Sequence, residues 1–156
     1  IKKIDFCIDL LKNSKYYSLW NNNNYIVASH NDLAYHNIII RDNKVYFIDF
    51  DYLKIDIRAK DISDFIIKTI KRFGFSVEMC DSIICNYDKV SRLTKEELEI
   101  MYIYMMYPSD FTILSIKYYK KLKEWSYESY LYKFKNKLSY EKEKKETLEY
   151  YKNNYL

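Results

Sequence analysis

The chain has one glycine, Gly74, and one proline, Pro108, in 156 residues, so the two residue types that most often interrupt regular structure are nearly absent. A phosphate-binding loop of the G-x-G-x-x-G or the G-x-x-x-x-G-K-S/T type needs at least two glycines and is therefore excluded. The scarcity also leaves Gly74 and Pro108 as two clear positions at which helices are expected to end.

Most of the chain after Tyr52 has apolar residues at the spacing of an amphipathic helix. Thr94 and Glu97 form a capping-box pattern, which predicts that a helix begins there and runs to Tyr107. The other predicted helices cover residues 1–12, 59–73, 77–87, 111–122 and 126–153, the last with the charged run "EKEKKE" as a solvated face. Met101 and Met105 are expected in the helical core.

Residues 25–51 have a different pattern. "YIVAS" leads into the runs "NIII" and "KVYFI", which flank the polar residues Arg41, Asp42 and Asn43 and predict a β-hairpin. No internal repeat or linker is recognisable. We therefore expect one α+β domain that is mainly helical, with a hairpin near its front.

Charge and composition narrow the class of protein. The 26 Lys and Arg against 22 Asp and Glu leave a net charge of +4, which is too small and too mixed to indicate a nucleic-acid partner. No apolar run approaches the roughly 20 residues of a membrane span, and no signal peptide is recognisable, so a cytoplasmic protein without a membrane partner is expected. Cys7, Cys80 and Cys85 lack C-x-x-C spacing and are expected to be reduced, mostly buried thiols.

The strongest chemical signal lies in "SHNDLAYHNIIIRDNKVYFIDFD", residues 29–51. His30, Asp32 and Asn37 stand as H-x-D-x-x-x-x-N, and "IDFD" brings Asp49 and Asp51 after the hairpin. Phosphoryl transfer by kinases uses this order, because a carboxylate orients the attacking hydroxyl while an amide and a second carboxylate hold Mg²⁺. Independent placement of residues would produce the first motif by chance in roughly one chain in a hundred.

These residues, with the following "YLKIDIRAKDISDF", resemble the aminoglycoside phosphotransferase and choline kinase superfamily, and most closely the spore coat kinase-like proteins of the CotS type. The resemblance is close over residues 25–67. It implies a protein-kinase-like fold in which Asp32 is the catalytic base and Asn37 and Asp49 are Mg²⁺ ligands. Asp51 could reach the metal or its waters.

The resemblance also implies two supporting residues, His30, which would brace the catalytic loop, and Asp61, which would hydrogen-bond the loop backbone. His36 has no assigned role. Asn31 replaces the glycine common between the His and the Asp in that family. Asn tolerates a positive φ better than other non-glycine residues do, so the loop is expected to form.

The chain lacks a strand-borne Lys paired with a helical Glu as well as a glycine-rich loop. We therefore expect residues 1–156 to be the C-terminal, helical lobe of a phosphotransferase, with the N-terminal nucleotide-binding lobe absent from this chain. ATP would be the co-substrate only with that lobe, and a small molecule or sugar would supply the acceptor hydroxyl. The lobe alone is expected to bind Mg²⁺ weakly and to be inactive.

Other interpretations remain open from the sequence. The aspartates could serve only as caps and turn acceptors in a hairpin. The chain could be a non-catalytic kinase-like protein that assembles with coat proteins in the spore coat. A basic, aromatic nucleic-acid binder is a third possibility, but no recognisable motif supports it. An aromatic set in the C-terminal part could line a substrate cleft or dock to other proteins: Tyr118, Tyr119, Trp125, Tyr127 and Tyr130.

Overall fold

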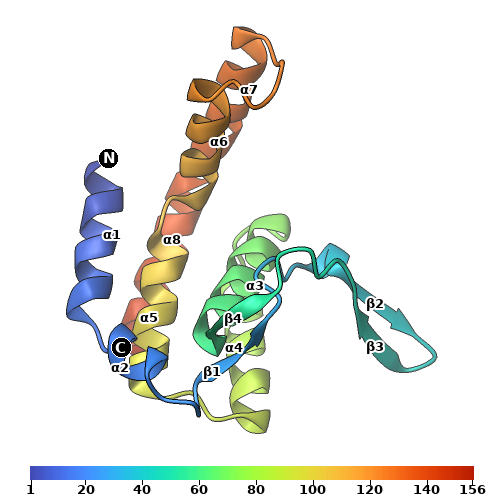
Figure 1. The fold of residues 1–156 in the computed structure, drawn as a ribbon, viewed down its shortest axis with the longest axis vertical. Helices are drawn as coiled ribbons and strands as arrows, with labels where there is room; N and C mark the ends of the chain where they lie inside the picture. The colour runs from blue at the N-terminus through green and yellow to red at the C-terminus, as the bar shows by residue number, and fades with distance from the viewer.

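The computed structural model describes all residues, 1–156, and has eight α-helices, one 3-10 turn and four short strands (Figure 1). The elements in chain order are α1 (Lys2–Asn13), α2 (Tyr16–Trp20), β1 (Ile26–Ser29), η1 (Tyr35–Asn37), β2 (Ile38–Arg41), β3 (Lys44–Phe47), β4 (Lys54–Ile57), α3 (Arg58–Arg72), α4 (Val77–Val90), α5 (Lys95–Met106), α6 (Ser109–Tyr119), α7 (Tyr127–Leu138) and α8 (Glu141–Tyr155). The expected mainly helical α+β architecture is confirmed. No helix combines the length and the apolar character needed to span a membrane.

The predicted hairpin is formed by β2 and β3, which pair in antiparallel register from Ile38 opposite Phe47 to Arg41 opposite Lys44. Asp42 and Asn43 make the two-residue turn, with φ of 51° and 58°. Two positive φ values are typical of a type I′ turn, whose twist matches that of the strands. Figure 1 shows this hairpin projecting away from the helical body.

A second antiparallel pair joins β1 to β4, with Val27 opposite Asp56 and Ser29 opposite Lys54. The prediction of a helical pattern from Tyr52 onward is wrong for residues 54–57, which form β4. The four residues of β4 are too few to show a strand pattern in the sequence. They are extended because they pair with β1. This pair leads directly into α3 and fixes where that helix begins.

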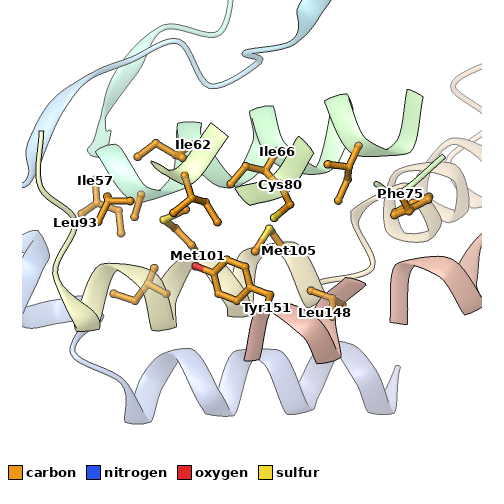
Figure 2. Packing of buried hydrophobic residues seen from close by; sticks show 14 of the residues in the cluster. Ile57, Ile62, Ile66, Phe75, Cys80, Leu93, Met101, Met105, Leu148 and Tyr151 are labelled. Carbon is orange, nitrogen blue, oxygen red and sulfur yellow. The ribbon is translucent and has the colours of Figure 1, made fainter. Parts of the chain in front are cut away.

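The hydrophobic core lies between α3, α4, α5 and α8, and β4 contributes Ile57. Figure 2 shows side chains of α3 and α5 facing one another, with Tyr151 of α8 beside them. Met101 and Met105 are buried, as expected, and Tyr151 is fully buried, with its hydroxyl donating to the Leu98 carbonyl at 3.0 Å. The core therefore joins residues from α2 to α8.

The helix ends follow the expected capping residues. Thr94 and Glu97 form the complete capping box at the start of α5. Gly74 follows α3 with φ of 76°, and the Phe75 N–H donates to the Ile70 carbonyl at 2.6 Å. This is the 6→1 hydrogen bond of a Schellman motif, which needs a left-handed residue just after the helix.

The predicted long helix over residues 126–153 is wrong, because the chain divides into α7 and α8 at Ser139 and Tyr140. Tyr140 turns inward, stacks on Phe75 with ring centroids 5.5 Å apart, and donates its hydroxyl to Asp110 at 2.5 Å. These tertiary contacts hold Tyr140 outside a continuous helix. No glycine or proline marks the break.

The expectation of mostly buried cysteines holds for two of the three, and the expected solvated face of the last helix needs a correction. Cys7 and Cys80 are buried, and burial raises the pKa of the Cys80 thiol to about 12, but Cys85 is exposed. The run "EKEKKE" is not solvated throughout, because Lys144 on α8 is only 8% exposed.

Candidate active site

The loop between β1 and η1 is fixed to α3 by one carboxylate. Asp61, in the first turn of α3, accepts hydrogen bonds from the backbone N–H groups of His30 at 2.6 Å and Asn31 at 2.7 Å. Asn31 has φ of 60°, the left-handed conformation that was expected at this position. Asp61 therefore determines the path of the backbone just before Asp32.

Asp32 is half-buried and faces a cavity of about 430 Å³. Its Oδ1 accepts a hydrogen bond from the Lys68 ammonium on α3 at 2.7 Å. Lys68 was not predicted from the sequence, because it lies 36 positions away and is one of 26 basic residues without a distinguishing motif. The structure thus adds a cation directly beside the candidate base.

Asn37 is buried at the end of η1 and connects two parts of the site. Its side-chain amide donates to the Asp32 backbone carbonyl at 3.0 Å, which closes the loop between them. Its own backbone carbonyl accepts the Ile48 N–H at 3.0 Å. Asn37 therefore lies between the Asp32 loop and the residue that directly precedes Asp49.

His30 is buried and, like Asn37, connects the Asp32 loop to the segment around Ile48. Its Nε2 lies 2.9 Å from the Ile48 carbonyl, and its ring centroid lies 4.8 Å from that of Phe50. His30 Nδ1, Ser29 Oγ and Asn31 Oδ1 are buried without a hydrogen-bond partner within the chain. Three such atoms in consecutive residues are unusual, and unpaired buried polar atoms often occur where a protein binds or acts on a ligand.

Asp49 and Asp51 follow β3 and are both exposed. Asp49 has φ of 64°, so the backbone turns sharply at this residue. No group of three His, Cys, Asp or Glu side chains is close enough to hold a metal ion. Asn37 and Asp49 nevertheless fit Mg²⁺ as a donor set, because this ion usually takes one or two protein oxygens and fills its other positions with water and phosphate.

His36 is exposed and packs edge-on against Tyr35, with ring centroids 5.3 Å apart. It makes no hydrogen bond to Asp32, Asn37 or Asp49. The hairpin and the loop thus bring together His30, Asp32 and Asn37 and leave the other histidine outside the candidate site.

Comparison with known proteins gives a family match and a structural neighbour. The sequence model described as choline/ethanolamine kinase matches residues 2–149. A search of curated proteins found no match. The crystal structure of an aminoglycoside phosphotransferase from Alicyclobacillus acidocaldarius is similar in fold, with a TM-score of 0.82 and 14% sequence identity. The alignment covers 97% of this chain and 46% of that one, so the chain spans about half the length of that phosphotransferase.

Proposed function

The chain belongs to the choline/ethanolamine kinase family, and from this membership we propose that it is the C-terminal lobe of an ATP-dependent phosphotransferase that acts on a hydroxyl group of a small molecule or sugar. The observation that carries the proposal is the arrangement around Asp32. A loop held by Asp61 presents Asp32 to a cavity, and Asn37 connects that loop to the segment of Asp49.

In this proposal Asp32 is the catalytic base. Its carboxylate accepts or orients the proton of the acceptor hydroxyl, so that the hydroxyl oxygen is held in line with the phosphoryl group. Lys68 holds Oδ1 of Asp32, which leaves the other carboxylate oxygen to face the acceptor. His30 and Asp61 are positioning residues, because they contact the backbone around Asp32 and not the reacting atoms.

Asn37 and Asp49 would hold Mg²⁺, and Asp51 could reach the ion or its waters. The ion would supply charge neutralisation on the phosphate groups when bound. The buried amide of Asn37 is fixed by its bond to the Asp32 carbonyl, whereas Asp49 is exposed. We therefore expect the Asn37 position to be preformed and the Asp49 side chain to be ordered by the ion.

We further propose that a nucleotide-binding lobe packs against the segment that follows β3. Apolar side chains are exposed there on one continuous stretch: Ile48, Phe50, Tyr52, Leu53 and Ile55. An exposed apolar stretch of this kind is typical of a surface that another domain or a ligand covers. ATP binding would need that lobe, and the isolated chain would not turn ATP over.

A second candidate function is that of a non-catalytic kinase-like protein that assembles in the spore coat, as the CotS-type resemblance implies. The observation that favours it is the exposed aromatic surface of α6 and α7, which includes Tyr119, Tyr127 and Tyr132. Aromatic side chains are enriched in protein interfaces. Coat proteins would then be the partners.

The test uses the protein with both lobes. We expect Asp32→Asn to abolish phosphoryl transfer and to leave nucleotide affinity nearly unchanged, and Asp49→Ala to weaken Mg²⁺-ATP binding measured by calorimetric titration. Asp42→Asn is the matched control, because Asp42 lies in the exposed hairpin turn and away from the cavity. Wild-type turnover in Asp32→Asn would exclude the assignment of the base. Absence of Mg²⁺-ATP binding in the wild type would favour the coat function.

A further inference from the structure

The turn between α6 and α7 forms an exposed end of the molecule. Figure 1 shows this turn at one end of the longest axis, away from the β2–β3 hairpin. All residues from Tyr118 to Glu128 are exposed. We call residues 117–128, with the sequence "KYYKKLKEWSYE", the α6–α7 tip. Neither the main core nor the candidate active site uses any of its side chains.

Large apolar and aromatic side chains of the α6–α7 tip are in contact with solvent. Tyr119 is 81% exposed, Tyr127 is 62% exposed and Leu122 is 57% exposed. Trp125, between the two helices, is also partly open to solvent. Exposed apolar side chains that occur together on one surface mark an interaction site.

Hydrogen bonds hold the α6–α7 tip in a defined conformation, so its exposure is not that of a frayed helix end. The Leu122 N–H donates to the Lys117 carbonyl at 3.0 Å, the 6→1 bond of a Schellman motif. Lys121 has φ of 50°, the left-handed conformation that this motif needs. The buried Tyr130 hydroxyl lies 3.1 Å from the Lys117 carbonyl and 3.2 Å from the Lys123 carbonyl. The chain therefore fixes Leu122 in an exposed position.

The excess positive charge of the chain lies around this tip. Residues 111–140 contain seven lysines and two glutamates, whereas the rest of the chain contains 19 basic and 20 acidic side chains. The tip itself has both glutamates and four of the lysines. These four lysines form no ion pair with any carboxylate: Lys117, Lys120, Lys121 and Lys123. The tip thus combines unpaired cations with exposed apolar side chains.

This combination fits an anionic lipid surface better than it fits a protein. Protein interfaces are enriched in arginine and depleted in lysine, and the last arginine of the chain is Arg92. At a bilayer, lysines are attracted to anionic headgroups, and Trp and Tyr lie at the level of the headgroups. A second copy of the tip would bring the same lysines together. Single-stranded nucleic acid is usually bound in a basic groove, whereas this tip is a projecting turn.

We propose that the α6–α7 tip binds the surface of an anionic phospholipid bilayer. Tyr119 and Leu122 enter the boundary between headgroups and acyl chains, while the lysines contact the headgroups. The lack of an apolar span, from which no membrane partner was expected, does not bear on binding of this peripheral kind. Asp32 lies outside the tip, so this surface is separate from the site proposed for phosphoryl transfer and does not depend on it.

Vesicle binding tests the assignment. We expect the chain to sediment with vesicles of equal parts phosphatidylcholine and phosphatidylserine and to stay in solution with vesicles of phosphatidylcholine alone. In Trp20→Phe, the anionic vesicles should shift the fluorescence of Trp125 to shorter wavelength. Lack of binding to the anionic vesicles overturns the proposal and leaves the tip to a protein partner. Equal binding to both kinds of vesicle, an unshifted Trp125 emission, or tighter binding to a single-stranded RNA oligomer overturns it as well.

Substitutions in the tip locate the contact. Each lysine near an anionic bilayer strengthens binding about fivefold. We therefore expect affinity for the anionic vesicles to fall about a hundredfold when three tip lysines are replaced together by glutamine: Lys120, Lys121 and Lys123. Leu122→Ser should weaken binding by about tenfold, because the leucine no longer buries its side chain among the lipids.

The matched control removes the same charge elsewhere. Three exposed lysines of α8 are replaced together by glutamine: Lys142, Lys145 and Lys152. We expect this variant to bind nearly as well as the wild type. Equal losses in the two triple variants, or wild-type binding by the tip variants, would place the contact outside the tip and overturn the proposal. If the tip triple variant does not fold by circular dichroism, Leu122→Ser decides.

Discussion

Asp61 fixes a loop that lies 30 positions earlier in the chain. Its two carboxylate oxygens accept the successive backbone N–H groups of His30 and Asn31, and the second of these residues has a left-handed backbone conformation. Asn31 can adopt this conformation, but it is uncommon outside glycine and needs support from its surroundings. The geometry at Asp32 therefore depends on a residue that belongs to α3.

The first prediction concerns this carboxylate. Asp61→Asn keeps the shape of the side chain but turns an NH₂ group toward one of the backbone N–H donors. We expect the free energy of unfolding to fall by about 2 kcal/mol, the cost of an unsatisfied buried donor. Urea unfolding measures it. Asp64→Asn, one turn along the same helix and paired only with Lys60, should cost less than about 0.5 kcal/mol. Equal losses in the two variants would contradict the role of Asp61.

Some residues of the site were predictable from sequence and others were not. The order of His30, Asp32 and Asn37 is a local motif, so the sequence alone brings them together. Lys68 was missed because its relation to Asp32 exists only after α3 packs against the loop. A pairing between distant positions leaves no local pattern when the residue type is common.

At the scale of elements, one ion pair joins the beginnings of two core helices. Arg58 at the start of α3 donates to both carboxylate oxygens of Glu97 in α5, at 2.6 and 2.8 Å, and also to the Arg92 carbonyl. Glu97 is 1% exposed and also accepts the Thr94 N–H as part of the capping box. The Glu97 carboxylate therefore caps the start of α5 and also joins α5 to α3 through Arg58.

The second prediction concerns this pair. Arg58→Met leaves Glu97 buried without its cation, and we expect a loss of about 3 kcal/mol or more in the free energy of unfolding. The double variant Arg58→Met with Glu97→Met should recover part of that loss, because it removes the buried charge. Thermal unfolding followed by calorimetry measures both. Arg92→Met, at an exposed side chain, should leave the melting temperature nearly unchanged.

The third prediction concerns pH. Burial opposes the ionisation of Asp110, but hydrogen bonds from Lys71 and Tyr140 outweigh it and lower its pKa to about 2, from an ordinary value of 3.8. A carboxyl group whose pKa is lower in the folded state stabilises the fold above pH 3.8, and the contribution is lost as the pH falls toward 2. We therefore expect Asp110→Asn to reduce the loss of stability over this interval, measured by urea unfolding at several pH values. Asp9→Asn, at an exposed position on α1, should follow the wild type.

Elements with their own capping signals were predicted well, and those defined by tertiary contacts were not. The Thr94–Glu97 box and Gly74 mark helix ends that the structure confirms. The break at Tyr140 has no such signal, because stacking on Phe75 and the bond to Asp110 produce it. A strand of four residues, such as β4, likewise depends on its partner.

At the scale of the whole molecule, the helices do not share one core. The main cluster takes residues from α2 to α5 and from α8, whereas α6 and α7 contribute none. These two helices have a small cluster of their own, in which Tyr130 packs against Tyr118 and Trp125. Figure 1 shows them together at one end of the molecule, away from β1 and α4.

The fourth prediction follows from this division. The chain has two tryptophans, Trp20 in α2 beside the main core and Trp125 between α6 and α7. The fluorescence of Trp125 alone is measured in Trp20→Phe, and that of Trp20 alone in Trp125→Phe. We expect the Trp125 fluorescence to change at a lower urea concentration than the Trp20 fluorescence. Smaller clusters open at a lower free energy than the main core. Coincident transitions would show that α6 and α7 unfold with the rest as one unit.

The projecting hairpin has a consequence for how this chain behaves in concentrated solution. β2 and β3 pair only with each other, so each strand has one side with free backbone donors and acceptors. Ile40 and Val45 are exposed on it, and neither strand contains a proline that would block pairing. Open strand edges of this kind template the addition of further strands and lead to aggregation. A lysine at Ile40 would oppose such growth without touching the core.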